Sequence, residues 1–484
     1  MKWRPIAHVF GLLLLVTAGA MVFPAVCSLL YGEDDFAAIA ISALITAGAG
    51  FPLWFLFRRD QDLDTREALF IAAFGWVAIS AVSALPFMLH GSIPSFTDAF
   101  FEMMSGYTTT GATILTDIEA VPHGLLFWRS ETHLLGGMGF LTLAVLFLPH
   151  GMGGLRIFRA ESSPGQVLTK EKFLPRNRDA LLWLWGIYIA LNVVQTALLA
   201  VGGMDLFDSI LTAFGTVSTS GYSPKNASIG HYGSAYFDWV ITLFMFLGGV
   251  TFMLFYFGLK GDWRAVARNT EFRWYAALTA AFCGIVAWIL YRNGDYGFAD
   301  SLRYACFQVV SLLTTTGFST ADYEQWPQQA QMFLYAVCFL GACAGSTTSG
   351  IKVIHYIVIC KFLVGAVKKI FFQPLTVLSV RVNGRALDQE VIYLSLAYFI
   401  VNIFLIYGGA CVVSLMDNVT IETAVSSVIA SLMNIGPGFG DIGPTENFAH
   451  LTPGTKWFLS WTMLVGRLEM FSALVIFYPS FWKR

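Results

Sequence analysis

The chain has 484 residues, of which 56% are hydrophobic and only 12% are charged, and its formal net charge at pH 7 is −2. Soluble domains carry about 25% charged residues, so this composition excludes a string of soluble domains, a disordered chain and a coiled coil. A net charge this small also excludes a nucleic-acid-binding protein, which leaves a protein that crosses a membrane several times.

Ten apolar segments are each long enough to span a hydrocarbon core of about 30 Å. The first follows the basic residues Lys2 and Arg4. It exceeds the roughly 7–15 residues of a secretory signal, so we expect it to remain as a helix. The segments lie near 6–30, 37–57, 68–90, 124–148, 180–201, 235–259, 274–291, 329–366, 391–416 and 455–481. Such long, evenly apolar runs indicate helices rather than barrel strands, so the predicted fold class is an all-α polytopic membrane protein.

The charged residues predict the orientation of these spans. With ten spans, both termini and the Lys- and Arg-rich loops fall on one side, which the positive-inside rule assigns to the cytoplasm. The basic loops lie at 58–66, 156–178, 260–273 and 368–385. The opposite loops are rich in acids, namely Glu33, Asp34, Asp35, Asp117, Glu119, Asp322, Glu324, Asp441 and Glu446. These acids either form a plain solvated rim or concentrate cations at an outer mouth.

After the first two spans, the sequence repeats four times. The copies align on Gly111, Gly221, Gly317 and Gly436, and small residues stand six and twelve positions before each glycine. We predict that each copy is a helix, a short re-entrant pore helix, a loop and a second helix, arranged around a central pore. The predicted boundaries are 1–67 for two N-terminal helices, 68–155 for repeat one, 156–266 for a cytoplasmic loop and repeat two, 267–370 for repeat three with a broken second helix, and 371–484 for repeat four. A further glycine follows 28 residues later at Gly139, Gly249 and Gly345, and 30 residues later at Gly466.

Hydroxyl residues surround the loop glycine in the first three copies. The runs are Thr108–Gly111, Ser218–Gly221 and Thr314–Gly317. Glycine tolerates backbone conformations that turn successive carbonyls to one side. Four such loops around one axis would form rings of carbonyl oxygen that replace the hydration shell of a monovalent cation. One such motif alone would be read as an ordinary loop, but four copies in equivalent positions favour a filter. The C-termini of the short helices would point partial negative charge inward, and Asp98, Asp208 and Glu422 stand near their N-termini.

These motifs resemble the Trk/Ktr/HKT superfamily of potassium transporters, and within it the TrkH/TrkG type of bacterial Trk systems. The resemblance rests on TTTGAT (108–113), STSGYS (218–223), TTTGFST (314–320), NIGPGFG (434–440), GACAGSTTSGIK (341–352) and GRLEMFSALVIFYP (466–479). It implies a backbone filter for K⁺, also passing Rb⁺, because all four filter positions are glycine. A serine at the first of them accompanies Na⁺ selectivity in some plant members.

The implied filter residues are Thr109, Thr110, Gly111, Ala112, Thr219, Ser220, Gly221, Tyr222, Thr315, Thr316, Gly317, Phe318, Asn434, Ile435, Gly436 and Pro437. The fourth copy departs from the hydroxyl pattern, so the filter is expected to be only pseudo-fourfold.

The eighth span is too long, and small and hydroxyl residues at 341–350 interrupt it. A packing kink is one explanation, whereas the resemblance implies an intramembrane gate beneath the filter. The gate residues are Gly345, Ser346, Thr347, Thr348, Ser349, Gly350 and Arg467. Arg467 is a costly mid-span cation, and we expect it to project below the filter and oppose cation passage. Lys352 either assists this gate or belongs to the cytoplasmic interface.

Two glycine motifs do not predict nucleotide binding. The GxGxxG at 438–443 follows no strand, and the phosphate-loop-like run at 345–352 lies within a span. With no nucleophile–base pair or metal-ligand spacing, the chain is not expected to be an enzyme or to hold a cofactor. A secondary transporter of a small solute and a Na⁺-selective relative remain the alternatives.

The resemblance also implies a bacterial inner-membrane location with both termini cytoplasmic, membrane lipid around the chain, and a homodimer. It further implies a cytosolic nucleotide-binding regulatory ring, for which the basic loops 156–178 and 260–273 are candidate docking surfaces. Passive flow of K⁺ and symport with H⁺ or Na⁺ both stay open.

Overall fold

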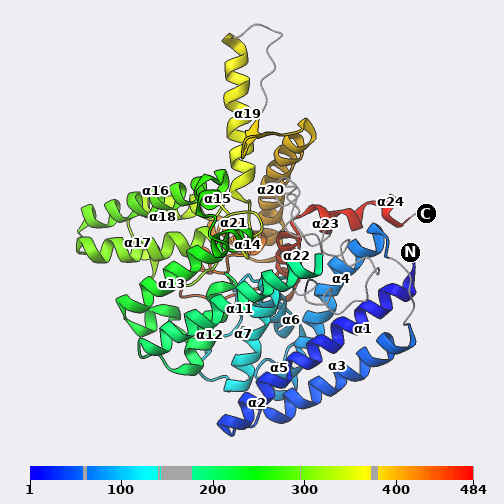
Figure 1. Cartoon of the computed structure of the whole chain (residues 1–484). Helices are drawn as coiled ribbons and strands as arrows, with labels where there is room; N and C mark the ends of the chain where they lie inside the picture. The colour runs from blue at the N-terminus through cyan, green and yellow to red at the C-terminus, as the bar shows by residue number, and fades with distance from the viewer. Residues whose placement is uncertain (58–62, 140–141, 143–176, 295, 372–379, 483–484) are drawn as a thin grey trace.

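The computed structural model describes residues 1–484 except 58–62, 140–141, 143–176, 295, 372–379 and 483–484 (Figure 1). Most of the predicted basic loop at 156–178 therefore lies outside the described residues. The described chain is built from helices, together with one short hairpin of β1 (Arg381–Val382) and β2 (Arg385–Ala386), which pair antiparallel.

Two N-terminal spans lie at one edge of the bundle (Figure 1). The first consists of α1 (Trp3–Ala20) and α2 (Val22–Tyr31), and the second is α3 (Phe36–Leu56). They approach so closely that a side-chain carbon added to Gly11 would lie 2.7 Å from the carbonyl oxygen of Gly50. At the far end of α1, the rings of Trp3 and Trp482 both pack against Phe70, at 5.7 and 6.2 Å. The two ends of the chain therefore lie side by side.

Each of the four repeats begins with a long helix followed by a short one. The long helices are α4 (Thr65–Ser83) continued by α5 (Leu85–His90), α11 (Asn177–Val201), α16 (Thr270–Asn293) and α20 (Gln389–Met416). With α1/α2 and α3, they make six helical stretches in the described residues that are long and apolar enough to cross a membrane. The short helices are α6 (Phe96–Tyr107), α12 (Leu206–Val217), α17 (Phe298–Leu313) and α21 (Ile421–Leu432).

Side chains fix the N-termini of three short helices. Ser95 caps α6 by accepting the backbone N–H of Asp98 at 3.4 Å. Asp205 caps α12 through the N–H of Phe207, and Thr420 caps α21 through the N–H of Thr423. These bonds satisfy donors that the first turn of a helix leaves without a partner.

The return helices of repeats two, three and four are broken, which corrects the sequence prediction for two of them. They are α13 (Ala235–Gly248) with α14 (Phe252–Leu259), α18 (Gln328–Val337) with α19 (Val353–Phe371), and α22 (Pro453–Arg467) with α23 (Phe471–Leu474), η3 (Val475–Phe477) and α24 (Pro479–Trp482). In repeat one, α7 (His123–Gly137) ends at Gly137, and most of the rest of the predicted segment 124–148 lies outside the described residues. The predicted break between α18 and α19 is present, but the uninterrupted spans predicted at 235–259 and 455–481 are wrong. The α13–α14 pair bends by 98°.

The glycines that follow each loop glycine by 28 or 30 residues lie at the ends of these helices or in the breaks after them, although they act in different ways. Gly139 and Gly345 adopt left-handed backbone conformations with φ of 82° and 73°. Gly249 stays right-handed, and an added side-chain carbon there would come within 2.9 Å of Ala342 Cβ. At Gly466, an added carbon would collide with the carbonyl oxygen of Leu432.

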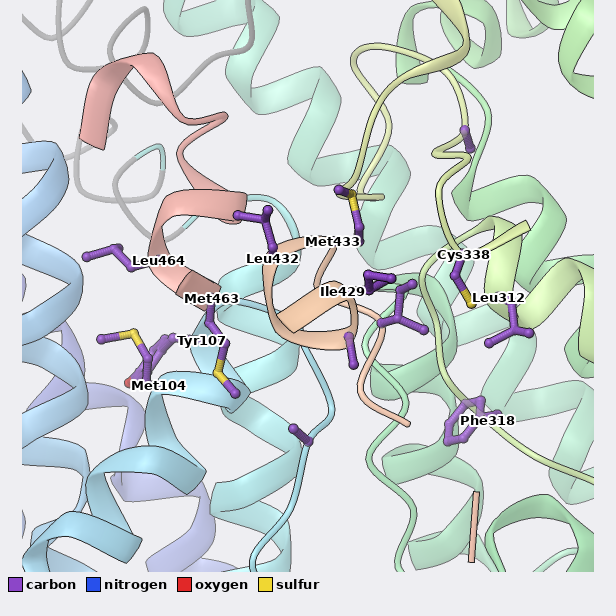
Figure 2. Packing of buried hydrophobic residues seen from close by; sticks show 14 of the residues in the cluster. Met104, Tyr107, Leu312, Phe318, Cys338, Ile429, Leu432, Met433, Met463 and Leu464 are labelled. Carbon is purple, nitrogen blue, oxygen red and sulfur yellow. The ribbon is translucent and has the colours of Figure 1, made fainter. Parts of the chain in front are cut away.

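The short helices and their loops form the centre of the molecule. Figure 2 shows Met104 and Tyr107 of α6 beside Met463 and Leu464 of α22, with Leu432 of α21 nearby. All five side chains are buried. This apolar packing lies beside the ends of α6 and α21, from which the loops to α7 and α22 begin. The remaining short elements, η1 (Ser228–Tyr232), η2 (Tyr323–Gln325) and α15 (Trp263–Arg268), lie in connections.

Candidate ion pathway

The four loops predicted to form a filter come together around one cavity of ≈ 130 Å³. Its lining includes the glycine of every loop, namely Gly111, Gly221, Gly317 and Gly436. The loops also share one backbone conformation. Each glycine has a positive φ between 79° and 97°, and the residue two positions earlier has a φ of 53° to 55°. Those earlier residues are Thr109, Thr219, Thr315 and Asn434.

Each loop glycine lies against a carbonyl of the neighbouring repeat. A side-chain carbon on Gly111 would collide with the carbonyl oxygen of Ser220, one on Gly221 with that of Thr316, and one on Gly317 with that of Ile435. On Gly436 the added carbon would meet the carbonyl oxygen of Thr110 at 2.7 Å, which closes the ring. Every carbonyl in this series belongs to the residue just before a loop glycine. Both the left-handed φ and the lack of space therefore require glycine at these positions.

The hydroxyl residues on either side of the left-handed position brace the loops. Thr108 donates to the carbonyl oxygen of Met104 at 2.6 Å, and its Oγ1 lies 2.8 Å from that of Thr110. Thr314 makes the matching bonds to Val310 at 2.7 Å and Thr316 at 2.8 Å. These hydroxyls give a second donor to carbonyls in the last turn of each short helix, which already accept the backbone N–H of the same threonine at 2.9 Å. Their presence in the motif is therefore explained by loop rigidity.

The fourth loop reaches the same conformation with different chemistry. Asn434 Nδ2 donates to Thr110 Oγ1 of the first repeat at 2.9 Å and to the carbonyl oxygen of Met463 at 2.9 Å. The amide of Asn434 thus joins repeat four to repeat one. The departure from the hydroxyl pattern changes the bracing of this loop but preserves its backbone.

The predicted gate segment lies against the left-handed residues of the filter loops. Thr315 Oγ1 accepts the backbone N–H of Ser349 at 3.1 Å, and Thr219 Oγ1 donates to Thr347 Oγ1 at 3.4 Å. Thr347 Oγ1 also donates to the carbonyl oxygen of Val217 at 3.0 Å, at the end of α12. The segment between α18 and α19 is therefore in direct contact with the filter loops of repeats two and three.

The same segment is anchored to the bend between α13 and α14. The N–H of Cys343 donates to the carbonyl oxygen of Gly249 at 3.1 Å, and Thr251 Oγ1 donates to that of Ala344 at 2.8 Å. The carboxylate of Glu271, at the start of α16, accepts the N–H of Ala344 at 2.7 Å. Among the predicted gate residues, Gly345 and Gly350 have φ values of 73° and 74°. Ser346 Oγ and Thr348 Oγ1 lie 2.7 Å apart, and Thr348 also accepts from buried Lys352 at 3.2 Å.

Arg467 links three parts of the pathway. Its Nη1 donates to Thr109 Oγ1 at 3.1 Å, to the carbonyl oxygen of Thr347 at 3.2 Å and to Ser349 Oγ at 3.4 Å. Its Nη2 donates to the carbonyl oxygens at the end of α7, including that of Gly137 at 2.9 Å. A helix C-terminus carries partial negative charge, so it stabilises this cation. Arg467 therefore joins the filter loop of repeat one to the gate segment of repeat three.

The outer loops use many of their acids as hydrogen-bond acceptors. Asp117 and Glu119 both bind Asn226 of the next repeat, at 2.9 and 3.2 Å, and Glu324 accepts the N–H of Gly440 at 2.5 Å. The cavity itself is lined by Glu446 and also by two cations, Lys225 and Arg129. Much of the predicted acidic rim therefore ties the outer loops of neighbouring repeats to one another.

Sequence reasoning missed a buried ion pair behind the first loop. Arg129 Nε donates to Glu102 Oε1 at 2.7 Å, and both side chains are at most 2% exposed. Arg129 lies inside the segment 124–148, which we had counted as apolar. An ionisable residue within a membrane segment is itself a signal of function, and a search of the segment 124–148 for such residues would have identified Arg129.

Comparisons with known proteins agree with this geometry. A family model described as TrkH, cation transport protein, matches residues 36–260 and 293–484. The Trk system potassium uptake protein TrkH of Salmonella typhimurium is 35% identical over 490 residues, covering 100% of both chains. The Trk system potassium uptake protein TrkG of Escherichia coli is 29% identical and covers 99% of both. The crystal structure of the potassium transporter TrkH from Vibrio parahaemolyticus superposes with a TM-score of 0.89 over 100% of both chains, at 30% identity.

Proposed function

The chain belongs to the TrkH family of cation transport proteins and serves potassium uptake, and from this premise we propose which of its residues select and gate K⁺. The transported ion is the substrate. The observation that carries the proposal is the closed ring in which each loop glycine faces a carbonyl of the next repeat.

The filter consists of the four loops at 109–112, 219–222, 315–318 and 434–437. Their backbone carbonyls replace water around a dehydrated K⁺ ion, and no side chain needs to coordinate it. Two features support this assignment: the shared backbone conformation and the bracing of the hydroxyls away from an ion-binding role. Rb⁺, a monovalent cation of similar coordination, passes the same filter.

The gate consists of residues 345–350 and Arg467. The guanidinium opposes the approach of a cation from below, and its bonds to Thr347 and Ser349 hold the gate segment under the filter. Opening requires these bonds to break, so an open state has the segment moved away from Arg467. The gate segment is also hydrogen-bonded to the α13–α14 bend, so a movement of α13 or α14 would be transmitted to the gate through these bonds.

The same family membership supports a cellular setting. Both termini, which lie side by side, face the cytoplasm of a bacterial inner membrane, as the basic loops predict. A homodimer and a cytosolic nucleotide-binding ring complete the assembly, and the loop at 260–273 is the described candidate for contact with that ring.

Uptake of ⁸⁶Rb⁺ into proteoliposomes tests the proposal. Wild-type protein with its regulatory subunit should accumulate ⁸⁶Rb⁺, and excess K⁺ should compete with it. Gly317→Ser should abolish most of this uptake because the added side chain collides with the carbonyl of Ile435. Absence of uptake by the wild-type protein, or full uptake by Gly317→Ser, would contradict the assignment of the filter.

A further inference from the structure

We propose that the buried Glu102–Arg129 ion pair, together with Tyr222, positions the filter loops of repeats one and two and thereby contributes to K⁺ selectivity. This inference rests on the proposed function of the loops. It assigns a role to three residues that do not themselves need to touch the ion.

Glu102 holds the chain just beyond the first filter loop. Its Oε1 accepts from Thr113 Oγ1 at 2.9 Å as well as from Arg129, and its Oε2 accepts the N–H of Ile114 at 2.9 Å. Because Glu102 lies on α6, these bonds fix the outer end of the loop to the helix that precedes it. The position of Gly111 is thus constrained from both sides.

Arg129 extends the same support to the second repeat. Its Nη1 donates to the carbonyl oxygen of Ser223 at 3.2 Å, two residues after Gly221. The guanidinium carbon also lies 3.4 Å from the centre of the Tyr222 ring, a cation–π contact. Arg129, on α7, therefore contacts both repeats. In repeat one it binds Glu102, which holds the end of the first filter loop, and in repeat two it contacts Tyr222 and Ser223, which follow Gly221.

Tyr222 closes the arrangement in the opposite direction. Its hydroxyl donates to the carbonyl oxygen of Glu102 at 2.7 Å and to that of Ala112 at 3.2 Å. Tyr222 and Ala112 belong to the filter loops of repeats two and one, so this side chain spans the boundary between them. The ring of His133 stacks on that of Tyr222, with ring centroids 3.9 Å apart.

The arrangement is confined to one part of the pseudo-fourfold ring. Glu102 stands nine residues before Gly111, and the corresponding residues in the other copies are Thr212, Gln308 and Ser427. These side chains carry no charge, so the equivalent positions cannot form the same pair. Selectivity depends on the distance between loops, and a charged brace stiffens the boundary of repeats one and two more than neutral contacts would.

Isosteric neutralisation tests this role. Glu102→Gln keeps the shape of the side chain but removes the charge that holds Arg129. We expect the ratio of ⁸⁶Rb⁺ to ²²Na⁺ uptake to fall about tenfold, the change that corresponds to weakening one hydrogen bond to a charged group. A purely structural role would lower both fluxes together and leave their ratio unchanged.

Two further variants keep the test decisive. Tyr222→Phe retains the ring beneath Arg129 but loses both hydroxyl bonds, and we expect a smaller fall in the same ratio. Asp98→Asn is the matched control because it neutralises the Asp98–Lys456 ion pair between repeats, whose atoms are 2.6 Å apart. The uptake ratio of Asp98→Asn should equal that of the wild type.

The outcomes separate the inference from the proposed function. A wild-type ratio in folded Glu102→Gln would overturn the inference, and if that variant does not fold, a wild-type ratio in Tyr222→Phe would do so. In both cases the wild-type protein still takes up ⁸⁶Rb⁺. Failure of the proposed function would instead appear as wild-type protein that takes up no ⁸⁶Rb⁺ at all.

Discussion

Replacing Arg467 by alanine should increase K⁺ flux, because this side chain holds the gate segment beneath the filter. The guanidinium makes two bonds to that segment, to the carbonyl oxygen of Thr347 at 3.2 Å and to Ser349 Oγ at 3.4 Å. The first distance is at the upper limit of the normal range of about 2.7–3.2 Å, and the second exceeds it. We therefore take about 1 kcal/mol for each, below the ~1.5–3 kcal/mol typical of hydrogen bonds to charged groups.

Together, the two bonds favour the closed arrangement by about 2 kcal/mol. Since each 1.4 kcal/mol is a factor of ten in an equilibrium constant, their loss shifts the balance between closed and open by about 30-fold. Flux rises by this factor only while the open state is rare, so the increase should be largest without the regulatory subunit. The assay is initial-rate ⁸⁶Rb⁺ uptake into proteoliposomes at matched protein content.

Two companion variants distinguish tethering from charge repulsion. Arg467→Lys keeps the positive charge but cannot reach the carbonyls of α7 and the gate segment together. If tethering dominates, its flux should rise toward that of Arg467→Ala, whereas repulsion alone would keep it near the wild type. Ser349→Ala removes one bond and should give a smaller increase. Flux of Arg467→Ala at or below the wild-type level, in correctly folded protein, would refute the reasoning.

The other predictions concern the filter, the outer loops and the contact between repeats. Gly317→Ser should lower ⁸⁶Rb⁺ uptake at least tenfold, because its φ of 83° and the neighbouring carbonyl both disfavour a side chain. Burial raises the pKa of Glu324, and this effect outweighs the hydrogen bond from the N–H of Gly440, which lowers the pKa. A carboxyl whose pKa is higher in the folded state contributes more stability at low pH, and that contribution is lost as pH rises through the folded pKa. The melting temperature of the wild type, measured relative to Glu324→Gln, should therefore increase from pH 7 to pH 5; an unchanged difference would count against it. Asp98→Asn should destabilise the protein by about 2 kcal/mol, between the values for exposed and buried pairs, as checked by thermal unfolding in detergent. Equal stability would mean that Lys456 finds another partner.

The repeat signal in the sequence was enough to predict the fold class and the four loops. Small residues and glycines recur at fixed spacing because each copy needs the same close approach of helix to loop. The left-handed residues, such as Thr109 and Asn434, could not be predicted because threonine and asparagine at those positions are compatible with several conformations. In the structure, the left-handed residue ends each short helix in a C-terminal turn, in which the N–H of the following residue reaches back five positions, as from Thr110 to the carbonyl oxygen of Ser105 at 2.9 Å.

The breaks within 235–259 and 455–481 were missed for a related reason. Hydropathy measures the length of an apolar run, and 235–259 is apolar throughout, yet the chain bends by 98° within it. The recurring glycines Gly139, Gly249 and Gly466 were the available signal. Their spacing indicated a repeat, but it did not show that each glycine lies at the end of a helix, where Gly139 turns the backbone and Gly249 and Gly466 allow close packing.

Comparing the residue after each break glycine explains how a fourfold scaffold acquires a single gate. Val250 follows Gly249, Ser346 follows Gly345, and Arg467 follows Gly466. Four arginines at this level would repel one another and any entering cation, while a single one can be neutralised by the carbonyls of α7 and the gate segment. Its bonds therefore have to reach across repeat boundaries, to Thr109 in one direction and Thr347 in the other. If the segment at 345–350 is the gate, as proposed above, its movement alters both the position of the charge and the support of a filter loop, and we expect gating and selectivity to be coupled through Arg467.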